Sequence, residues 1–371
     1  MPQLTIYHLS FPHGLHIGAG GVESLEDTLE TIPSDTLFAA LLDTAVHLGW
    51  DVSRLLPQNG APAFRVTSAF PFAGRVRFYP KPVDLRELFS PEKIKDFGAG
   101  KNIKKIRYLS EALLERARQG ATLDDELKKD SDGEWVCKFS LQGGAFWLTE
   151  TEISALPESM RLYTEKVNGE EQKKERSSEA LGRQKVFETQ TAPRVTVDRV
   201  SSASNLFHSE RVLFSEGCGL WFGAAGQVED LSHLLTVLGD SGLGGERTAG
   251  YGHFTYEPRG TLEFNDPQTC AYLLSRWHPK EGEMAWLKHS AYKLEAVDGW
   301  LRTPENAAAQ RRKRLWMVAE GSLIAGNPQG DAENVAPKYE NKDKPGEYVR
   351  GVSHPVYRPG FALALDWKTK K

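Results

Sequence analysis

The sequence predicts an α+β fold that begins with a ferredoxin-like (RRM-like, βαββαβ) domain, and three observations lead to this prediction. Short strand patterns alternate with amphipathic helix patterns in a β-α-β…β-α-β order, which is the order of this topology. A long polar and basic stretch interrupts that order at residues 73–190. A glycine-rich segment, residues 241–252, lies between the last helix and the last strand of the unit.

The first domain is expected to begin with a strand and a helix. Residues 3–9 alternate apolar and polar side chains, as a half-buried strand does. A helix is expected to follow, with Ser34 as its N-cap, Asp35 in its first turn and Gly49 at its end. Its buried stripe is expected at Leu37, Leu41, Ala45 and Leu48. Residues 64–72 are expected to return as a strand.

A long insertion is expected in the middle of this domain, at residues 73–190. Its early part is basic and poorly periodic. From residue 158 to residue 188 the chain is almost wholly polar, and Asn168-Gly169 suits a type I′ hairpin turn. We therefore expect a projecting hairpin or a partly disordered arm at residues 158–188.

Regular elements resume after this arm. Strand patterns are found at residues 195–197, 211–214 and 220–222. Residues 228–238 then predict a short amphipathic helix that Gly239 ends. An aromatic strand is expected at residues 251–257, directly after the glycine-rich segment.

A border between two domains is indicated by Pro258-Arg259-Gly260. The first domain would cover residues 1–259 and the second residues 260–371, and a chain of 371 residues is long enough for both to bury a core. Strand patterns in the second domain are found at residues 287–297, 315–324 and 361–365.

The segment from Ser241 to Gly252 carries the strongest functional signal. Glycine allows positive φ and a close approach to a ligand, freed N–H groups can hold an anion, and a planar guanidinium fits phosphate. We therefore expect Arg247 to pair with a phosphate, Thr248 to offer a hydroxyl and Tyr251 a stacking ring. The glycines expected to contact the ligand are Gly242, Gly244, Gly245 and Gly250.

Two other interpretations of this segment stay open. It could be a plain glycine-rich turn braced by a structural Arg247, or the phosphate-binding loop of a nucleotide-dependent enzyme. The second needs the order strand, glycines, helix, because phosphate binds at the helix N-terminus. Here the helix comes first, Arg247 stands where the third glycine of a dinucleotide motif belongs, and no Gly-Lys-Ser/Thr occurs. We therefore predict no cofactor.

The helix–glycine loop–strand unit resembles the RAMP superfamily of CRISPR-associated proteins, whose glycine-rich loop contacts CRISPR RNA. Further segments, in the same order along the chain, resemble the subunit family of type III-A (Csm) effector complexes that caps the 5′ tag of the crRNA. These segments are His13–Gly18, Ile32–Leu41, Phe78–Pro82, Lys104–Leu109, Ala192–Arg199, Glu320–Ile324 and His354–Gly360. The resemblance covers nearly the whole chain.

The resemblance implies a fold, a function and partners. The fold would be two ferredoxin-like domains, the second one degenerate. The function would be that of a non-catalytic crRNA-binding subunit in antiviral defence, which holds the 5′ tag while the arm at residues 158–188 pries apart the junction between tag and guide. The partners would be crRNA, the large subunit with a polymerase-like palm domain, and the repeated backbone subunit.

Basic residues from separate segments are expected to line the RNA groove. They are Lys81, Lys104, Lys105, Arg194 and Arg199. The last two alternate with Val195 and Val197 in a strand-like run, which places arginines at the edge of an apolar face. A merely solvated surface is the alternative. His16 and Ser34, from the family-like N-terminal segments, complete the expected RNA contacts.

His13 and His16 raise a further alternative, a metal-independent crRNA-processing endoribonuclease of the same superfamily. A histidine suits general acid–base work because its ordinary pKa is near ~6.5. The glycine-rich loop of those enzymes lies close to the C-terminus, whereas 119 residues (371 − 252) follow Gly252 here. We therefore predict no catalytic residue.

Composition limits the class of protein. The formal charge of −4 excludes a general polycation, so a nucleic acid would have to bind through a local basic groove. Cys137, Cys218 and Cys270 lie far apart and predict reduced core residues rather than a metal site. No leader-like N-terminus and no long apolar run is found, so we expect a soluble cytoplasmic protein without membrane contact.

Overall fold

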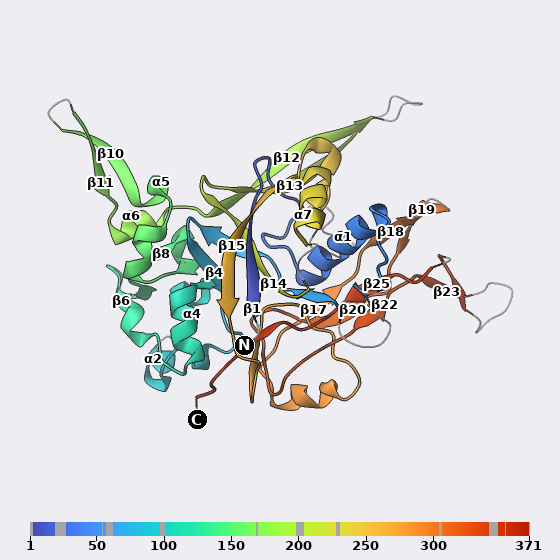
Figure 1. Ribbon diagram of the computed structural model, residues 1–371. Coiled ribbons are helices and arrows are strands. Elements are labelled where there is room, and N and C mark those ends of the chain that lie inside the picture. The colour runs from blue at the N-terminus through green and yellow to red at the C-terminus, as the bar shows by residue number, and fades with distance from the viewer. Residues whose placement is uncertain are drawn as a thin grey trace.

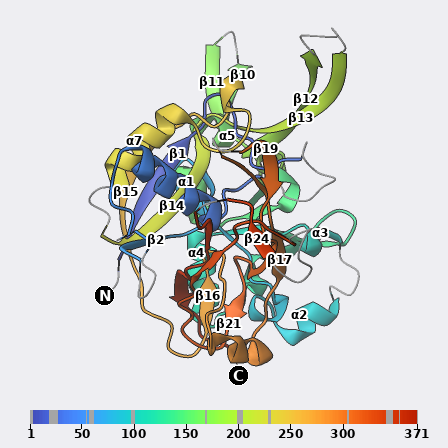
Figure 2. The ribbon, with the colours of Figure 1, turned by 90° about the vertical axis from the view of Figure 1, so that its right-hand side faces the viewer.

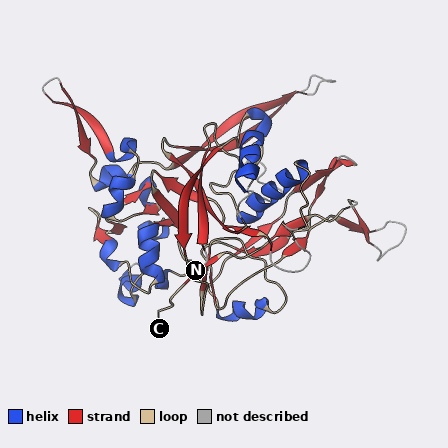
Figure 3. Ribbon diagram, viewed as in Figure 1, coloured by secondary structure: helices blue, strands red, loops and turns tan. Residues whose placement is uncertain are grey.

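The computed structural model describes residues 3–18, 27–53, 55–56, 62–96, 101–167, 170–197, 204–227, 231–303, 306–340, 348–352 and 354–370. Two long hairpins project from a central body in different directions (Figure 1). One is formed by β10 (Leu162–Val167) and β11 (Glu170–Glu175), the other by β12 (Phe187–Val197) and β13 (Ser204–Phe214). Helices gather on the flanks of the central strands (Figure 3).

A nine-stranded sheet forms the centre of the body. Its order is β15 (Thr255–Glu263), β1 (Gln3–Ser10), β14 (Cys218–Gly226), β3 (Phe70–Ala73), β4 (Val76–Pro80), β5 (Tyr108–Ser110), β9 (Phe146–Trp147) and β8 (Ser140–Leu141). The ninth strand, β2 (Phe64–Val66), also pairs with β14. The N-terminal strand β1 therefore lies between β14 and β15, two strands that come more than 200 residues later in the chain.

Strand β1 divides the core into two layers because its side chains alternate between the faces of the sheet. Leu4 and Ile6 pack into one apolar cluster, whereas Tyr7 and Leu9 pack into another. The second cluster lies beneath helices α1 (Ser34–His47) and α7 (Leu231–Ser241), which contact each other. The two helices lie side by side on the same flank of the sheet (Figures 1 and 2).

The predicted first strand and first helix are confirmed, with one correction at the helix start. The expected stripe is buried except at Leu48, which is half-buried, and Gly49 ends the helix with φ 73°. The N-cap position is Pro33, not Ser34, and no side chain caps the helix. The Ser34 hydroxyl instead accepts a hydrogen bond from the Arg276 N–H at 2.9 Å, so a contact distant in sequence takes the place of the local cap.

Three further predicted elements have different limits in the structure. Residues 64–72 form two strands, β2 and β3, because the chain leaves the sheet between them: the Ser68 N–H donates to the carbonyl of Leu274. Helix α7 continues past Gly239 to Ser241. A Cβ on Gly239 would lie 2.5 Å from the Phe254 carbonyl oxygen, so this glycine allows close packing and does not end the helix. The last strand begins at Thr255, four residues later than predicted.

The insertion builds a flank of short elements beside β5, β9 and β8. They are α2 (Pro91–Asp96), α3 (Lys101–Lys104), α4 (Glu111–Arg118), β6 (Leu127–Lys129), β7 (Trp135–Cys137), α5 (Glu158–Arg161) and α6 (Ser178–Gly182). The hairpin expected within residues 158–188 is present as β10/β11, while its Asn168-Gly169 turn lies outside the described residues. The second hairpin, β12/β13, is longer, and the separate strand patterns at 195–197 and 211–214 did not predict it.

The C-terminal part is a set of small antiparallel sheets. Its strands are β16 (Ala271–Leu273), β17 (Leu294–Val297), β18 (Trp300–Thr303), β19 (Asn306–Arg311), β20 (Leu315–Val318), β21 (Leu323–Ile324), β22 (Ala332–Asn334), β23 (Lys338–Glu340), β24 (Tyr348–Arg350), β25 (Tyr357–Pro359) and β26 (Ala364–Asp366). Among its described residues the only helical segment is a 3-10 helix, Glu283–His289. The molecule is thus α+β overall, and the expected border at Pro258–Gly260 lies inside β15.

All three cysteines are buried as free thiols, and the described helices are short or polar. Cys137, Cys218 and Cys270 are free and buried, and burial raises the pKa of each thiol to about 12. No described helix combines the length and the apolar character that crossing a membrane would require.

A buried ion cluster joins the start of α1 to the C-terminal part. Asp35 is almost fully buried and accepts hydrogen bonds from Arg276, at 3.4 Å, and from Arg358, at 2.5 Å. Arg276 also donates to Glu295 at 2.7 Å and lies 3.9 Å from Glu320. Burial alone would lower the pKa of Arg276, but Asp35, Glu320 and Glu295 together raise it. Arg276 is therefore held in its charged form, whereas burial raises the pKa of Glu320.

We predict that Asp35→Asn lowers the free energy of unfolding by about 3–5 kcal/mol, because it leaves two buried guanidinium groups without their shared carboxylate. Urea denaturation measures the change. The matched control is Asp43→Asn on the same helix, where the side chain is 69% exposed, and the expected change is below about 1 kcal/mol. Equal losses in the two variants would contradict a dominant role for the cluster.

Candidate functional site

The glycine-rich loop is packed tightly against the chain itself. Gly242, Gly244, Gly250 and Gly252 all have positive φ, between 78° and 95°. A Cβ on Gly244 would lie 2.2 Å from the His16 carbonyl oxygen, and one on Gly245 would lie 2.8 Å from the His16 ring. At Gly250 nothing lies within 4 Å of a Cβ. Two of the expected ligand-contacting glycines are thus required by internal packing, whereas Gly250 faces open space.

The loop rests on the segment that follows β1. The Gly245 N–H donates to the His16 carbonyl at 2.9 Å, and the Gly252 N–H donates to the Gly14 carbonyl at 2.9 Å. On its other side the same segment pairs with β13, because Leu15 and Val212 exchange hydrogen bonds at 2.9 and 2.8 Å. The β1 extension therefore joins the glycine loop to the base of the β12/β13 hairpin.

His16 is part of this support. Its side chain is buried, and Nδ1 donates to the carbonyl of Glu210 at 2.7 Å. The ring lies beneath Gly245, whose missing side chain makes room for it. His16 thus positions the loop, and its 8% exposure leaves little of the imidazole for contact with a ligand or for acid–base chemistry.

Arg247 and Thr248 have the opposite character. Both are exposed on a short 3-10 turn, Arg247–Ala249, that projects from the loop. The turn begins after Glu246, a non-glycine residue held at φ 54°. Within the described part of the chain, no ion pair or side-chain hydrogen bond engages the Arg247 guanidinium. This is the arrangement that a phosphate contact needs.

Tyr251 links the loop to the second hairpin. Its side chain is buried, and the guanidinium carbons of Arg194 and Arg211 lie 5.4 and 5.3 Å from the ring centroid. Arg194 also donates to the Tyr251 hydroxyl at 2.7 Å. The ring therefore orients two arginines, and it is not exposed for stacking on a base as the sequence suggested. Arg211 was missed because a single arginine in a strand pattern carries no signal of its own.

The remaining expected contacts lie elsewhere. Ser34 is buried and holds Arg276 and Ser68. Lys81 follows β4, and Lys104 and Lys105 are exposed at the end of α3, whereas the glycine loop leads into β15 at the far edge of the sheet. Figure 2 shows α3 and α7 on opposite sides of the molecule. Arg199 lies outside the described residues.

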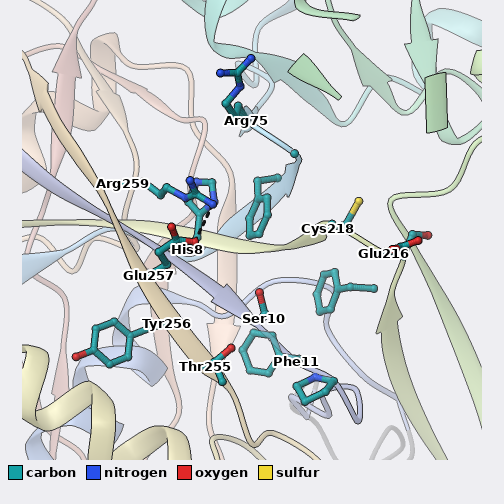
Figure 4. A pocket seen from close by; sticks show the side chains of 16 residues that line it. His8, Ser10, Phe11, Arg75, Glu216, Cys218, Thr255, Tyr256, Glu257 and Arg259 are labelled. Carbon is teal, nitrogen blue, oxygen red and sulfur yellow. Dashed lines mark ion pairs between the residues drawn. The ribbon is translucent and has the colours of Figure 1, made fainter. Parts of the chain in front are cut away.

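A pocket of about 860 Å³ lies beside β1 and β15 (Figure 4). Residues of β1, β15 and the β3–β4 and β13–β14 turns line it. Its lining carries two arginines, Arg75 and Arg259, and two glutamates, Glu216 and Glu257, and Arg259 pairs with Glu257 at 2.7 Å. The absence of a net charge in this lining gives no preference for an anion.

His8 forms part of this pocket wall. It stacks on Phe72 with ring centroids 4.0 Å apart, and its Nδ1 is buried without a hydrogen-bond partner. Burial, followed by repulsion from Arg259 and Arg77, lowers the pKa of His8 from 6.5 to about 3. The folded protein therefore holds a neutral imidazole here at all moderate pH values.

We predict that Gly244→Ala destabilises the protein far more than Gly250→Ala. Both positions have positive φ, which costs an alanine about 1–2 kcal/mol, but only Gly244 adds a clash with backbone, worth about 1–3 kcal/mol more. Thermal melting of the two variants measures the difference. Similar melting temperatures would mean that the loop does not rest on His16.

We predict that His8 makes stability fall as the solution becomes more acidic. Below about pH 6.5 the unfolded chain binds a proton that the folded chain excludes, so the contribution is complete above that pH and is lost as pH falls toward 3. The expected slope is about 1.4 kcal/mol per pH unit. Urea denaturation between pH 6 and pH 4 should show stability falling with acidification more steeply in the native protein than in His8→Phe, by up to this amount per pH unit. Parallel curves would contradict it.

Comparisons relate this chain to known CRISPR proteins. Residues 267–367 match the family model of the CRISPR Csm4 C-terminal domain. The chain is 28% identical over 178 residues to Csm4 of Thermococcus onnurineus, covering 47% of this chain and 52% of that protein. It is 32% identical over 161 residues to Csm4 of Mycobacterium tuberculosis, covering 41% and 49%. These matches span about half the length of both relatives.

Longer alignments have lower identity. Csm4 of Methanocaldococcus jannaschii is 23% identical over 384 residues, covering 96% of this chain and 95% of that protein. A chain of a Csm3–Csm4 subcomplex of a type III-A CRISPR-Cas interference complex aligns over 98% of this chain and all of that chain, with a TM-score of 0.57 and 16% identity. A chain of a Csm1–Csm4 cassette with pppApA aligns over all of both chains, with a TM-score of 0.51 and 18% identity. The family model and the relatives make this chain Csm4-like over parts of its length, as its motifs predicted, and the solved structures share its fold.

Proposed function

We propose that this Csm4-like chain is a non-catalytic crRNA-binding subunit of a type III-A CRISPR effector complex. It would hold the 5′ tag of the crRNA and link the large palm-domain subunit to the repeated backbone subunit. The family model and the named relatives support this assignment. The solved assemblies with this fold, Csm1–Csm4 and Csm3–Csm4, support two protein neighbours.

One observation carries the RNA-binding proposal: the exposed Arg247 on a loop that the rest of the chain holds rigid. The glycines and His16 fix the backbone, so the guanidinium is presented from a preorganised turn. Tyr251, four residues after Arg247, holds Arg194 and Arg211, so two further cations lie where the glycine loop meets the β12/β13 hairpin. An RNA phosphate is the ligand that such a group of arginines recognises best.

The expected site residues then have two kinds of role. Arg247, Thr248 and the open backbone at Gly250 would touch RNA directly, whereas Gly242, Gly244, Gly245, His16 and Tyr251 would position them. Lys81, Lys104 and Lys105 would contact a different part of the RNA, on the far side of the sheet. Lys81 is the least exposed of these three lysines, and its burial lowers the pKa of its ammonium group.

The hairpins suit a role at the junction between tag and guide. The arm expected at residues 158–188, to which the separation of tag and guide was ascribed, corresponds to the hairpin β10/β11. Its second strand is polar and exposed throughout. In β12/β13, Val195 and Leu206 face each other across the strands and are 57% and 60% exposed. An exposed apolar pair beside arginines is better suited to contact bases, so we assign the separation of bases to β12/β13.

The strand order supports the proposed first ferredoxin-like unit. Strands β15, β1, β14 and β3 are antiparallel neighbours in that order, and α1 and α7 cover one face. Since β15 continues to Glu263, we place the end of this unit four residues beyond the expected 259. The second, degenerate unit remains a proposal that rests on the family.

We predict that Arg247→Ala weakens binding of tag RNA by about 1–3 kcal/mol, the value of a lost charge-assisted contact. Fluorescence anisotropy with a labelled tag oligonucleotide, on the free protein and on the assembled complex, measures the change. Thermal stability should be unaltered because the guanidinium is exposed. Arg86→Ala, which removes an exposed arginine on the insertion, is the control and should bind as the native protein does. An equal loss of stability in Arg247→Ala would show a structural arginine instead.

A further inference from the structure

A second basic site lies at the opposite edge of the central sheet from the glycine loop. A cavity of about 690 Å³ opens between the β6–β7 hairpin, the connection from β8 to β9 and the start of α6. Four cationic side chains line it, against two acidic ones. The cations are Lys128, Lys129, Lys138 and Arg183. In a protein with a formal charge of −4, this is a local reversal of sign.

In the described part of the chain, neither Asp130 nor Glu179 forms an ion pair with these cations. Asp130 turns its carboxylate into the β6–β7 turn, where it accepts hydrogen bonds from the N–H groups of Asp132 and Glu134 at 3.0 and 2.9 Å. Lys128 donates to the Ser178 hydroxyl at 2.9 Å, a neutral partner. Among the described residues, Lys138 and Arg183 have no ion-pair partner. The cavity therefore keeps uncompensated positive charge.

The backbone at the cavity wall is open at two consecutive glycines. Gln142, Gly143 and Gly144 are consecutive residues with φ of 51°, 66° and 94°. Gln142 is held in this conformation by its side-chain oxygen, which accepts from the N–H groups of Val186 and Phe187 at 2.9 and 3.3 Å. A Cβ on either glycine would meet nothing within 4 Å. Gly143 and Gly144 are thus open toward the cavity, while the Gly144 carbonyl accepts a hydrogen bond from the Trp147 indole at 3.1 Å; a non-glycine at positive φ, as at Gln142, is common at ligand sites.

We propose that this cavity binds the phosphodiester backbone of single-stranded RNA, at a site separate from the glycine loop. The preference for an anion follows from the lining alone, whereas the choice of RNA rests on the proposed function. A free nucleotide fits less well because a base needs an exposed flat surface, and Trp147, the aromatic residue of the lining, is 1% exposed. The lysines of the β6–β7 hairpin, with Arg183 at the end of α6, instead match successive phosphates of a chain.

The position fits an RNA that passes the β10/β11 hairpin. Helix α6 begins three residues after β11 ends, so the cavity lies at the base of that hairpin (Figure 1). The basic surface extends to Lys93, whose ammonium lies 3.4 Å from the centroid of the Trp135 ring, with Lys129 at 5.2 Å from the same ring. An aromatic ring among cations, as at Trp135, is typical of surfaces that bind single-stranded nucleic acid along its backbone.

The test uses the full chain and the double variant Lys138→Ala/Arg183→Ala. The probe is a labelled uridine RNA of roughly 20 nucleotides, longer than a single binding fold occupies. Anisotropy titrations over a range of salt concentrations should show weaker binding, and the slope of log K against log[salt] should flatten by about 1.4 for two lost phosphate contacts. The matched control, Lys280→Ala/Lys288→Ala, removes two exposed lysines beside the 3-10 helix and should leave the slope unchanged.

Two further measurements separate the possible outcomes. A short tag oligonucleotide should bind equally to the native protein and to the cavity variant but weakly to Arg247→Ala, so failure of the tag site and failure of the cavity are distinguishable. Calorimetric titration with ATP tests the other source of phosphate. An unchanged uridine-RNA slope in the cavity variant would overturn the proposal, as would ATP binding that the variant abolishes, because the site would then serve a mononucleotide.

Discussion

The buried carboxylate of Asp35 is the point on which the arrangement of the two halves of the chain depends. An ionised group without water must be paired, so the start of α1 requires Arg276 and Arg358 beside it. The C-terminal strands are thereby held against α1, where Phe361 also packs edge-on against Phe38. Three of the family-like segments, residues 32–41, 320–324 and 354–360, converge on this cluster, so much of the resemblance reflects internal structure.

The glycine loop shows how a rigid support and a free contact can share one segment. Its glycines remove side chains where the loop meets His16 and Leu243, and the resulting hydrogen bonds fix the backbone. The loop hydrogen-bonds to the β1 extension, and the β1 extension pairs with β13. The position of Arg247 is therefore tied to the β12/β13 hairpin. Tyr251 strengthens this coupling because it holds arginines of both hairpin strands.

Local patterns predicted the elements well where local physics decides them. The strand at residues 3–9, the stripe of α1 up to Ala45, the C-terminal glycine at residue 49 and the polar hairpin within residues 158–188 appear as expected, but β1 is buried on both faces and not half-buried. The predictions failed where a distant segment intervenes. Ser34 caps nothing because Arg276 occupies its hydroxyl, and Gly239 does not end a helix because Phe254 packs on it.

The sequence by itself determined the α+β class, the order of elements in the first unit and the residue types that a phosphate site needs, because these depend on periodicity, turn chemistry and side-chain charge. Only the tertiary structure decided which of those residues are available. It buried Ser34, His16 and Tyr251, left Arg247 exposed, brought in Arg211 and moved Lys81, Lys104 and Lys105 to another side of the sheet. Exposure and proximity arise from long-range packing, which no local pattern records.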